Sequence, residues 1–379
     1  MKRLLTPALL MTVLLLTGCG RNNIRYEPPV FPVEREACFE ILGDGLLFNT
    51  AQDLYVYKDW LVLPALNMQT RKTLHIYDKH TGAPVAGAIR EGRGPGETIQ
   101  GNRAPSLRND TLYYYDLTQN LMQCFPVDSL THSSYPVREI KMEGTGRTNL
   151  CIYIGNGILL NQTCKAGFTA AVDDELPIEL LLQTLDGNVL SRHTLLEIPD
   201  ETGRMNEYLY WNCVMDLSPD GSRCVIGTFY GAVLQIFSID DDRLEPTGIR
   251  YFVKPDIEAL EYTYDFNENT IAGFADICCT DDRIYTAYDG HTPVQKYYDD
   301  YTPDMGQMYS DIAVFDHEGR PLELIRTDMT IVKLCYDGTE NTVYALTEDT
   351  EGTLHFGRLR MQGRQGCCIF RSLFLFLPP

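Results

Sequence analysis

The stretch that decides the fold is DLYVYKDWLVLPALNMQTRKTLHIYDKHTGAPVAGAI, residues Asp53–Ile89. Four short runs rich in aromatic and branched residues lie near Asp53–Lys58, Trp60–Pro64, Thr73–Asp78 and Pro84–Ile89. The polar segments KD, NMQTRK and DKHTG separate them, and such runs bounded by turn residues predict antiparallel strands joined as hairpins. A single four-stranded unit cannot bury its faces alone, so we expect the chain to repeat it.

The same pattern recurs along the rest of the chain. Further strand-rich units are expected at about 104–142, 148–198, 210–254, 272–327 and 330–361. A step of about fifty residues with four strands in each unit is typical of propeller blades. We therefore predict an all-β fold, a six-bladed β-propeller of four-stranded antiparallel blades over residues 37–361. Because 379 residues could also form two domains, two stacked β-sandwiches remain the alternative.

The last unit indicates how the ring closes. It shows only three clear strand-like runs, whereas CFEIL at Cys38–Leu42 stands alone before the first unit. We expect this N-terminal strand to complete the last blade. Closure of this kind pairs the two terminal edges, which would otherwise promote aggregation. The segment 362–379, which contains the apolar run Leu373–Leu377, fits no blade and is predicted to be an atypical tail.

Two short motifs carry a resemblance to a known family. SPDGSRCVIG at residues 218–227 resembles the turn and strand of TolB-like propellers, and GRGPGE at residues 92–97 resembles a motif of six-bladed, TolB-like bacterial lipoproteins. The resemblance extends over most of residues 19–361. It implies a fold and a cell-envelope location, but no particular reaction.

The N-terminus has the pattern of a secretory signal. Lys2 and Arg3 precede the apolar run LLTPALLMTVLLL, which is shorter than the roughly 20 residues of a membrane-spanning helix. LTGC at Leu16–Cys19 resembles the lipobox of bacterial lipoproteins, which implies that Cys19 carries the lipid anchor after residues 1–18 are removed. The alternative is an ordinary signal peptide. Residues 19–36 are polar and rich in Pro, so we expect a tether there.

The residue after Cys19 indicates the membrane in which the protein is anchored, and the net charge indicates which partners to expect. The residue after Cys19 is Gly20, and it is not the Asp that retains lipoproteins in the inner membrane. We therefore expect a lipid-anchored protein of the outer membrane that faces the periplasm. The net charge of −20 repels phosphate backbones, so we expect no nucleic-acid partner. The 12 Cys show no zinc spacing, and we expect no metal and no cofactor. No GxSxG or HExxH motif occurs, so no catalytic residue can be named.

The connections between the expected strands differ in length on the two faces of the ring. In a propeller, the first–second and third–fourth connections of each blade lie on one face, and these are short polar turns here. The other connections are long and lie on the opposite face, where loops usually carry function. Their aromatic and acidic residues are candidate binding residues: Tyr208, Tyr210, Trp211, Tyr264, Tyr297, Tyr298, Asp299, Asp300 and Tyr301.

Aromatic rings next to carboxylates suit sugars, cationic peptides or aromatic ligands. We therefore predict a membrane-anchored binding or scaffold module for an envelope protein or a glycan-derived ligand. The alternative function is a carboxylate-based hydrolase or lyase acting on a sugar or a peptide through the same face. For each single ring, packing of its loop onto the blades is the alternative role.

The Gly-rich stretch after the first blade is predicted to be a structural turn. Gly92, Gly94 and Gly96 alternate, but no Lys-Ser/Thr pair or helix follows, so the stretch fits no phosphate-binding loop. Gly94-Pro95-Gly96-Glu97 fits a type II turn, because Pro favours the second position and Gly accepts positive φ at the third.

Overall fold

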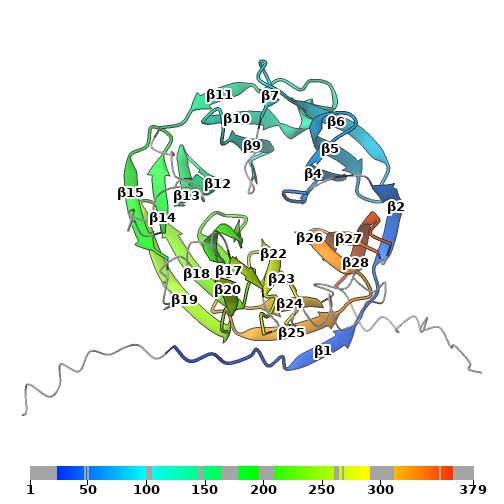
Figure 1. The fold of residues 1–379 in the computed structure, drawn as a ribbon. Coiled ribbons are helices and arrows are strands. Elements are labelled where there is room, and N and C mark those ends of the chain that lie inside the picture. The colour runs from blue at the N-terminus through cyan, green and yellow to red at the C-terminus, as the bar shows by residue number, and fades with distance from the viewer. Residues whose placement is uncertain are drawn as a thin grey trace, which may run out of the picture.

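The computed structural model describes residues 24–46, 48, 51–99, 105–143, 148–163, 178–195, 209–259, 264–266, 269–290, 311–349 and 351–361. These residues form six four-stranded antiparallel blades arranged in a ring (Figure 1). The all-β, six-bladed propeller predicted from the sequence is confirmed. No helix in these ranges is long and apolar enough to cross a bilayer.

The blades follow one another along the chain. Blade 1 contains β3 Tyr55–Tyr57, β4 Trp60–Asn67, β5 Lys72–Asp78 and β6 Pro84–Glu91. Blade 2 contains β8 Ser106–Arg108, β9 Thr111–Asp116, β10 Leu121–Pro126 and β11 Arg138–Lys141. Blade 3 contains β12 Thr148–Gly155, β13 Ile158–Thr163, β14 Glu179–Thr184 and β15 Val189–Thr194.

The second half of the ring has the same pattern. Blade 4 contains β16 Cys213–Leu217, β17 Arg223–Thr228, β18 Ala232–Asp240 and β19 Arg243–Val253. Blade 5 contains β22 Phe274–Cys279, β23 Ile284–Tyr288, β24 Asp311–Phe315 and β25 Pro321–Arg326. Blade 6 contains β26 Thr330–Asp337, β27 Thr342–Glu348, β28 Leu354–Arg360 and the N-terminal strand β2 Glu40–Leu46.

The hydrophobic core lies between neighbouring blades. The middle strands have both faces covered, so β23 is buried along its whole length and β27 along almost all of it. One cluster joins Leu160 of blade 3 to Cys224 and Ile226 of blade 4, all fully buried. Each blade therefore completes the core of the next, as the repeated pattern predicts.

The ring is closed by β2, which pairs antiparallel with β28 with Ile41 opposite Gly357. This confirms the predicted closure by the N-terminal strand. Figure 1 shows β2 beside β28 and next to blade 1. The remaining short elements are β1 Val33–Glu36, β7 Glu97–Thr98, the 3-10 helix η1 Val127–Thr131, β20 Ile257–Ala259 and β21 Tyr264–Phe266.

The segment predicted to be a tether differs from that expectation. From residue 24 onward it forms an arm, residues 24–36, that lies against blades 4 and 5. Its strand β1 pairs parallel with β25 as a fifth strand of blade 5. The Phe31 ring packs 5.7 Å from the Phe315 ring. The polar composition of the arm does not predict this packing. The packing depends on a free strand edge and a few aromatic rings elsewhere in the chain.

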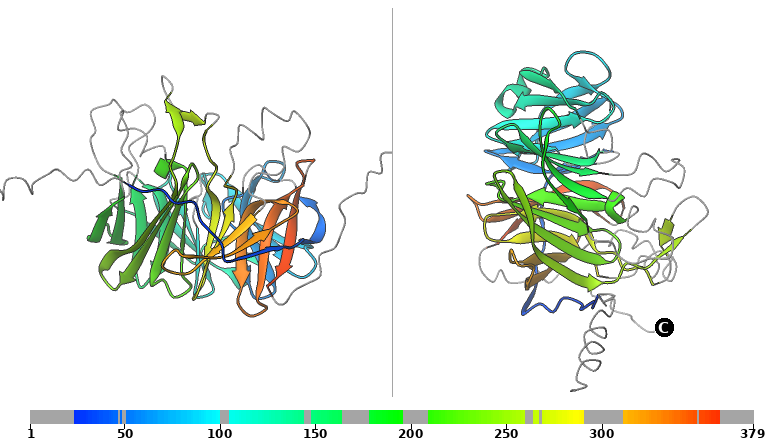
Figure 2. Two further views of the ribbon diagram at one scale, coloured as in Figure 1. Left: turned by 90° about the horizontal axis from the view of Figure 1, so that it is seen from below. Right: turned by 90° about the vertical axis from the view of Figure 1, so that its left-hand side faces the viewer.

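Strand order sorts the connections onto two sides of the ring. We call the side with the first–second and third–fourth connections the short-turn side, and the other the long-loop side. The connections 92–105, 164–178, 195–212, 254–273 and 289–310 join strand ends on the long-loop side. The longest connection on the short-turn side is 127–137, which contains η1. In Figure 2 the pair β20–β21 projects from the long-loop side.

Candidate functional site

The structure describes only a few of the residues predicted to bind a ligand. The candidates outside the described residues are Cys19, Tyr208, Tyr297, Tyr298, Asp299, Asp300 and Tyr301. Of Tyr264, the structure describes the backbone, which lies in β21. Trp211 is partly buried in the short helical turn 209–211, just before blade 4.

Tyr210, in the same turn, lies in the core. It is 1% exposed, and its hydroxyl accepts a hydrogen bond of 2.7 Å from the Gln235 amide. Its carbonyl accepts hydrogen bonds from the side-chain amides of Asn149 and Gln162. The ring therefore packs the connection onto blades 3 and 4 instead of facing a ligand. A sequence alone does not distinguish the two roles, because both need an aromatic residue in a long connection.

The Gly-rich stretch forms a tight turn next to β7. The Glu97 amide donates to the Gly94 carbonyl at 3.0 Å, and Gly96 has a φ of +73°. Pro95 and Gly96 thus occupy the central positions of a type II turn. The Glu97 carboxylate accepts the Gly94 amide at 2.8 Å, and the Gly92 amide donates to the Thr98 carbonyl at 2.9 Å.

Asp116 connects this turn to blade 2. Its carboxylate is fully buried and accepts the Thr98 hydroxyl at 2.8 Å and the Ile99 amide at 2.6 Å. Burial alone would raise the pKa of Asp116, but hydrogen bonds from Gln119, Ile99 and Thr98 outweigh it and lower the pKa. The stretch therefore fastens blade 1 to blade 2, and the Glu97 carboxylate and the Thr98 hydroxyl are used within the protein.

The inner strands line a half-open cavity in the centre of the ring. It has a volume of about 170 Å³, and its polar lining includes Asp53, Tyr55, Arg108 and Asp216. The Asp53 carboxyl accepts the Leu54 amide at 2.7 Å and the Tyr55 hydroxyl at 2.5 Å. The Tyr55 hydroxyl also lies against the carbonyl oxygen of Pro105 in blade 2.

The central carboxyl groups have raised pKa values. Burial, together with the charges of Asp276 and Asp216, raises the pKa of Asp53 to about 8, although Lys333 opposes the shift. Burial also raises the pKa of Asp216 to about 6, against the hydrogen bond from the Cys279 amide. Asp53 therefore keeps its proton at neutral pH. The sequence signal for such groups is an Asp inside an apolar run, as in VMDL and FADICC.

Several polar side chains of the inner strands bind the backbone of the next blade. Asp216 accepts the Cys279 amide at 2.8 Å, which joins blade 4 to blade 5. Asp276 accepts the Leu334 amide at 2.8 Å and pairs with the Lys333 ammonium at 2.8 Å, which joins blade 5 to blade 6. The Ser106 hydroxyl accepts the Tyr153 amide of blade 3. The central polar groups thus form a belt that holds the blades in register.

The size and chemistry of the cavity limit what it can do. Pockets for small organic ligands usually measure roughly 300–1,000 Å³, so the central cavity is too small for a glycan or a peptide. Among the described residues, no group of three or more His, Cys, Asp or Glu side chains is arranged to hold a metal ion. Burial raises the pKa of the lining thiols Cys278, Cys279 and Cys335, which makes them unreactive.

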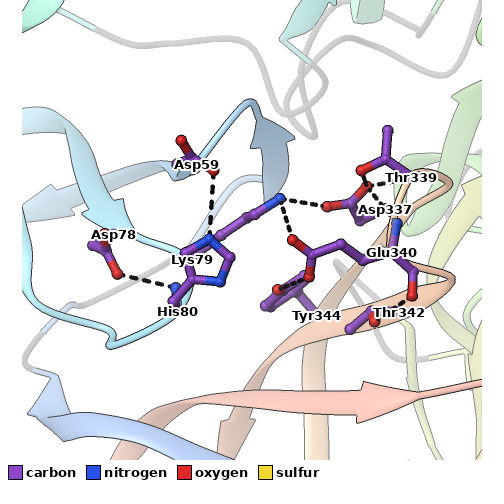
Figure 3. A network of polar contacts seen from close by, with 9 residues as sticks. All are labelled: Asp59, Asp78, Lys79, His80, Asp337, Thr339, Glu340, Thr342 and Tyr344. Carbon is purple, nitrogen blue, oxygen red and sulfur yellow. Dashed lines mark hydrogen bonds and ion pairs between the residues drawn. The ribbon is translucent and has the colours of Figure 1, made fainter.

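A second polar cluster lies on the short-turn side, where blade 1 meets blade 6. Figure 3 shows the Lys79 ammonium between Asp337 and Glu340, at 2.7 Å and 2.9 Å. The side chains of Lys79 and Asp337 are both 4% exposed. Glu340 also accepts the Tyr344 hydroxyl. This cluster joins the first blade to the last and leaves little polar surface for a ligand.

Comparisons with known proteins agree with this architecture. The TolB-like 6-blade propeller-like family matches residues 44–339. The crystal structure of a candidate exported protein of Bacteroides fragilis has a TM-score of 0.51 at 11% sequence identity, covering 87% of this chain and 99% of that chain. The structure of a DUF4221 family member from Bacteroides vulgatus has a TM-score of 0.49 at 12% identity, covering 84% and 95%.

No curated protein matches the chain. At 11% sequence identity, the Bacteroides fragilis structure shows the fold alone. The family match spans well over half of the chain and includes the blade motifs that suggested the resemblance. The protein therefore belongs to the TolB-like family of six-bladed propellers.

Proposed function

We propose that the protein is a lipid-anchored binding or scaffold module of the cell envelope, which recognises an envelope protein or a glycan-derived ligand through its long-loop side. The observation that carries this proposal is the distribution of the connections. Five long connections join strand ends on one side of a closed ring, and one of them contains the projecting pair β20–β21. Loops held by a rigid scaffold are the usual place for recognition.

The chemistry of the centre supports surface recognition over catalysis in the channel. The cavity of about 170 Å³ cannot hold a sugar chain, and the Asp216 and Asp276 carboxyl groups accept backbone amides of the next blade. The lipobox-like LTGC ending at Cys19 supports anchoring in the envelope. We further propose the outer membrane, with the propeller in the periplasm.

One observation favours the alternative of a carboxylate-based hydrolase or lyase. Asp53 and Asp216 line the same cavity, and their pKa values are raised to about 8 and about 6. Carboxyl groups with separated pKa values can act as acid and base. Because the cavity is too small for a glycan chain or a peptide, the substrate of this alternative would be a single small sugar. Release of product from a small sugar derivative by the purified protein, abolished by Asp53→Asn, would establish this alternative.

The test of the binding function is a comparison of partners between two variants. The anchored protein is cross-linked in its own envelope, purified, and its partners are identified by mass spectrometry. In the test variant the connection 291–309 is shortened; in the control, Gly-Ser is inserted in the short turn at Asp241-Asp242. We expect the test variant alone to lose the specific partners. If the same partners are identified with both variants, recognition by the long-loop side is contradicted.

A further inference from the structure

We infer that the long-loop side of the propeller faces the membrane that holds the lipid, so that its partner is a protein embedded in that same membrane. This rests on the proposed lipid anchor at Cys19. It follows from the position of the N-terminal arm, residues 24–36, which makes the connection to the anchor much shorter than the sequence predicts.

The arm is fixed to the ring by several kinds of contact. Its strand β1 pairs with β25 over Val33–Glu36. The Arg35 guanidinium pairs with the Glu323 carboxylate at 2.6 Å, with both side chains mostly buried. Phe31 packs against Phe315, which is fully buried. The arm therefore moves with the ring rather than as a flexible linker.

The arm begins at the long-loop side of blade 4. The Tyr26 ring packs edge-on against Tyr251 at 5.8 Å, and the Glu27 amide donates to the Tyr251 carbonyl at 2.8 Å. Tyr251 lies near the end of β19 that leads into the long connection 254–273. Tyr26 also packs in a cluster with Ile257 of β20. In the left view of Figure 2, the dark blue arm starts near the side from which β20–β21 projects.

The remaining distance to the anchor is short. Four residues, Gly20 to Asn23, separate Cys19 from Ile24. Five extended Cα–Cα steps reach at most about 18 Å. The nine steps from Tyr251 back along β19 to Asp242 span about 30 Å, so the short-turn end of blade 4 lies beyond this reach. The acyl chains at Cys19 therefore hold the long-loop end of blade 4 within about 18 Å of the lipid headgroups.

This position restricts the partner. A ligand recognised by the long-loop side must be reachable within a narrow space above the bilayer. The protein carries a net charge of −20, which gives it little attraction for anionic lipid headgroups. A membrane-embedded protein that exposes its surface at the headgroup layer meets the geometry without requiring the propeller to bind lipid directly.

The test measures how close each end of β19 lies to the bilayer. The exposed residues Lys254 and Asp242 stand at the two ends of this strand. Each is replaced by Cys in a separate lipidated variant and labelled with a fluorophore, after Cys38, Cys164, Cys367 and Cys368 are changed to Ser. In vesicles of neutral lipid with a headgroup-attached energy acceptor, we expect Lys254→Cys to lose several-fold more donor fluorescence than Asp242→Cys. Equal losses, or a greater loss at position 242, would overturn the inferred orientation.

Two controls separate the orientation from the anchor. Insertion of a 20-residue Gly/Ser segment between Asn23 and Ile24 should make the two losses similar, because the arm would no longer set the distance. Cys19→Ala should release the protein from the vesicles. If Cys19→Ala remains bound as tightly as the parent, the anchor proposal fails and this inference fails with it. If Cys19→Ala is released but the two labelled lipidated variants lose equal donor fluorescence, the anchor proposal stands and only the orientation is wrong.

Discussion

At the residue scale, the buried Lys79 joins the two ends of the ring. Burial alone would lower its pKa, but hydrogen bonds to Asp337 and Glu340 outweigh this and raise it, so the ammonium stays charged. Hydrogen bonds from Lys79 and Thr339 likewise overcome burial and lower the pKa of Asp337. Such a cluster stabilises the fold only while all its members are present.

We predict that Lys79→Met lowers the free energy of unfolding by about 3–5 kcal/mol, because Asp337 would be a buried charge without its cation. Urea denaturation followed by circular dichroism measures the change. His80→Ala, which changes the exposed neighbouring residue, is the matched control and should cost less than about 1 kcal/mol. Adding Asp337→Asn to Lys79→Met should recover part of the loss. A loss below about 1 kcal/mol for Lys79→Met would show that the cluster contributes no more than a surface pair.

Asp53 should make stability depend on pH. Its pKa is about 8 in the folded protein and about 3.9 when unfolded, so the folded state binds the proton more tightly. Its favourable contribution is complete below about pH 4 and is lost as pH rises to about 8. Relative to the parent, Asp53→Asn should therefore gain stability with increasing pH in this window, by up to about 1.4 kcal/mol per pH unit.

Urea denaturation at several pH values between 4 and 8.5 measures this difference. Asn keeps an acceptor for the Leu54 amide and the Tyr55 hydroxyl. Asp242→Asn makes the same chemical change in an exposed turn and is the matched control. A constant difference between Asp53→Asn and the parent would mean that Asp53 is ionised in the folded protein throughout.

The sequence predicts single residues well only when local geometry determines their role. Positive φ at Gly96 follows from the order Gly94-Pro95-Gly96-Glu97, because four consecutive residues define the turn. The burial of Tyr210 and the meeting of Asp53, Asp216 and Asp276 depend on strands that are far apart in sequence. No local pattern contains that information.

At the element scale, the closing strand β2 contacts blade 1 through two glycines. A Cβ atom at Gly82, in the last turn of blade 1, would lie 2.6 Å from the Leu42 carbonyl oxygen. A Cβ atom at Gly43 would lie 3.0 Å from the Gly82 carbonyl oxygen. Gly82 also has a φ of +71°. This turn can approach the closing strand only because it lacks a side chain.

Gly82→Ala should lower the free energy of unfolding by more than the roughly 1–2 kcal/mol that positive φ alone costs, since the methyl group also meets backbone atoms. Gly157→Ala is the matched control in a turn of blade 3, where φ is +78° but a Cβ atom would meet nothing within 4 Å. The urea midpoint of unfolding compares the two variants. Equal midpoints would contradict a close contact between β2 and blade 1.

Most strands are predictable from the sequence, but added edge strands are not. The runs Trp60–Pro64 and Thr73–Asp78 lie within β4 and β5, because alternation and turn residues are local signals. The strand β1 has the sequence VERE and no strand-like pattern. It forms because β25 offers unpaired backbone groups at the edge of blade 5. Its existence depends on a partner almost 300 residues away, as the 288-residue separation of Arg35 and Glu323 shows.

At the scale of the whole molecule, the number of blades and the closure of the ring follow from the repeat. The last unit has three strands and the N-terminus has one spare strand, so the N-terminal strand is expected to complete the last blade. The pairing of β2 with β28 confirms this. The side of the ring from which the arm leaves could not be predicted. It depends on contacts of Tyr26 and Phe31 with blades 4 and 5, which no repeat pattern describes.

The closure should determine whether the ring unfolds as one unit. A variant that begins at Ala37 loses the arm but keeps β2, so we expect a lower melting temperature and a single transition. A variant that begins at Asp53 also loses β2 together with Phe39, whose ring lies next to Gly357, and this exposes the edge of β28. We expect this variant to unfold over a broader range and to self-associate through the free edge.

Calorimetry and light scattering distinguish these outcomes. For the variant that begins at Ala37, the calorimetric and van't Hoff enthalpies should agree, as in a two-state transition. For the variant that begins at Asp53, the van't Hoff enthalpy should be smaller than the calorimetric one, and the apparent mass should rise with concentration. If the second variant instead melts as sharply as the first and stays monomeric, the inter-blade contacts of Asp216, Asp276 and Lys79 hold the ring together without its closing strand.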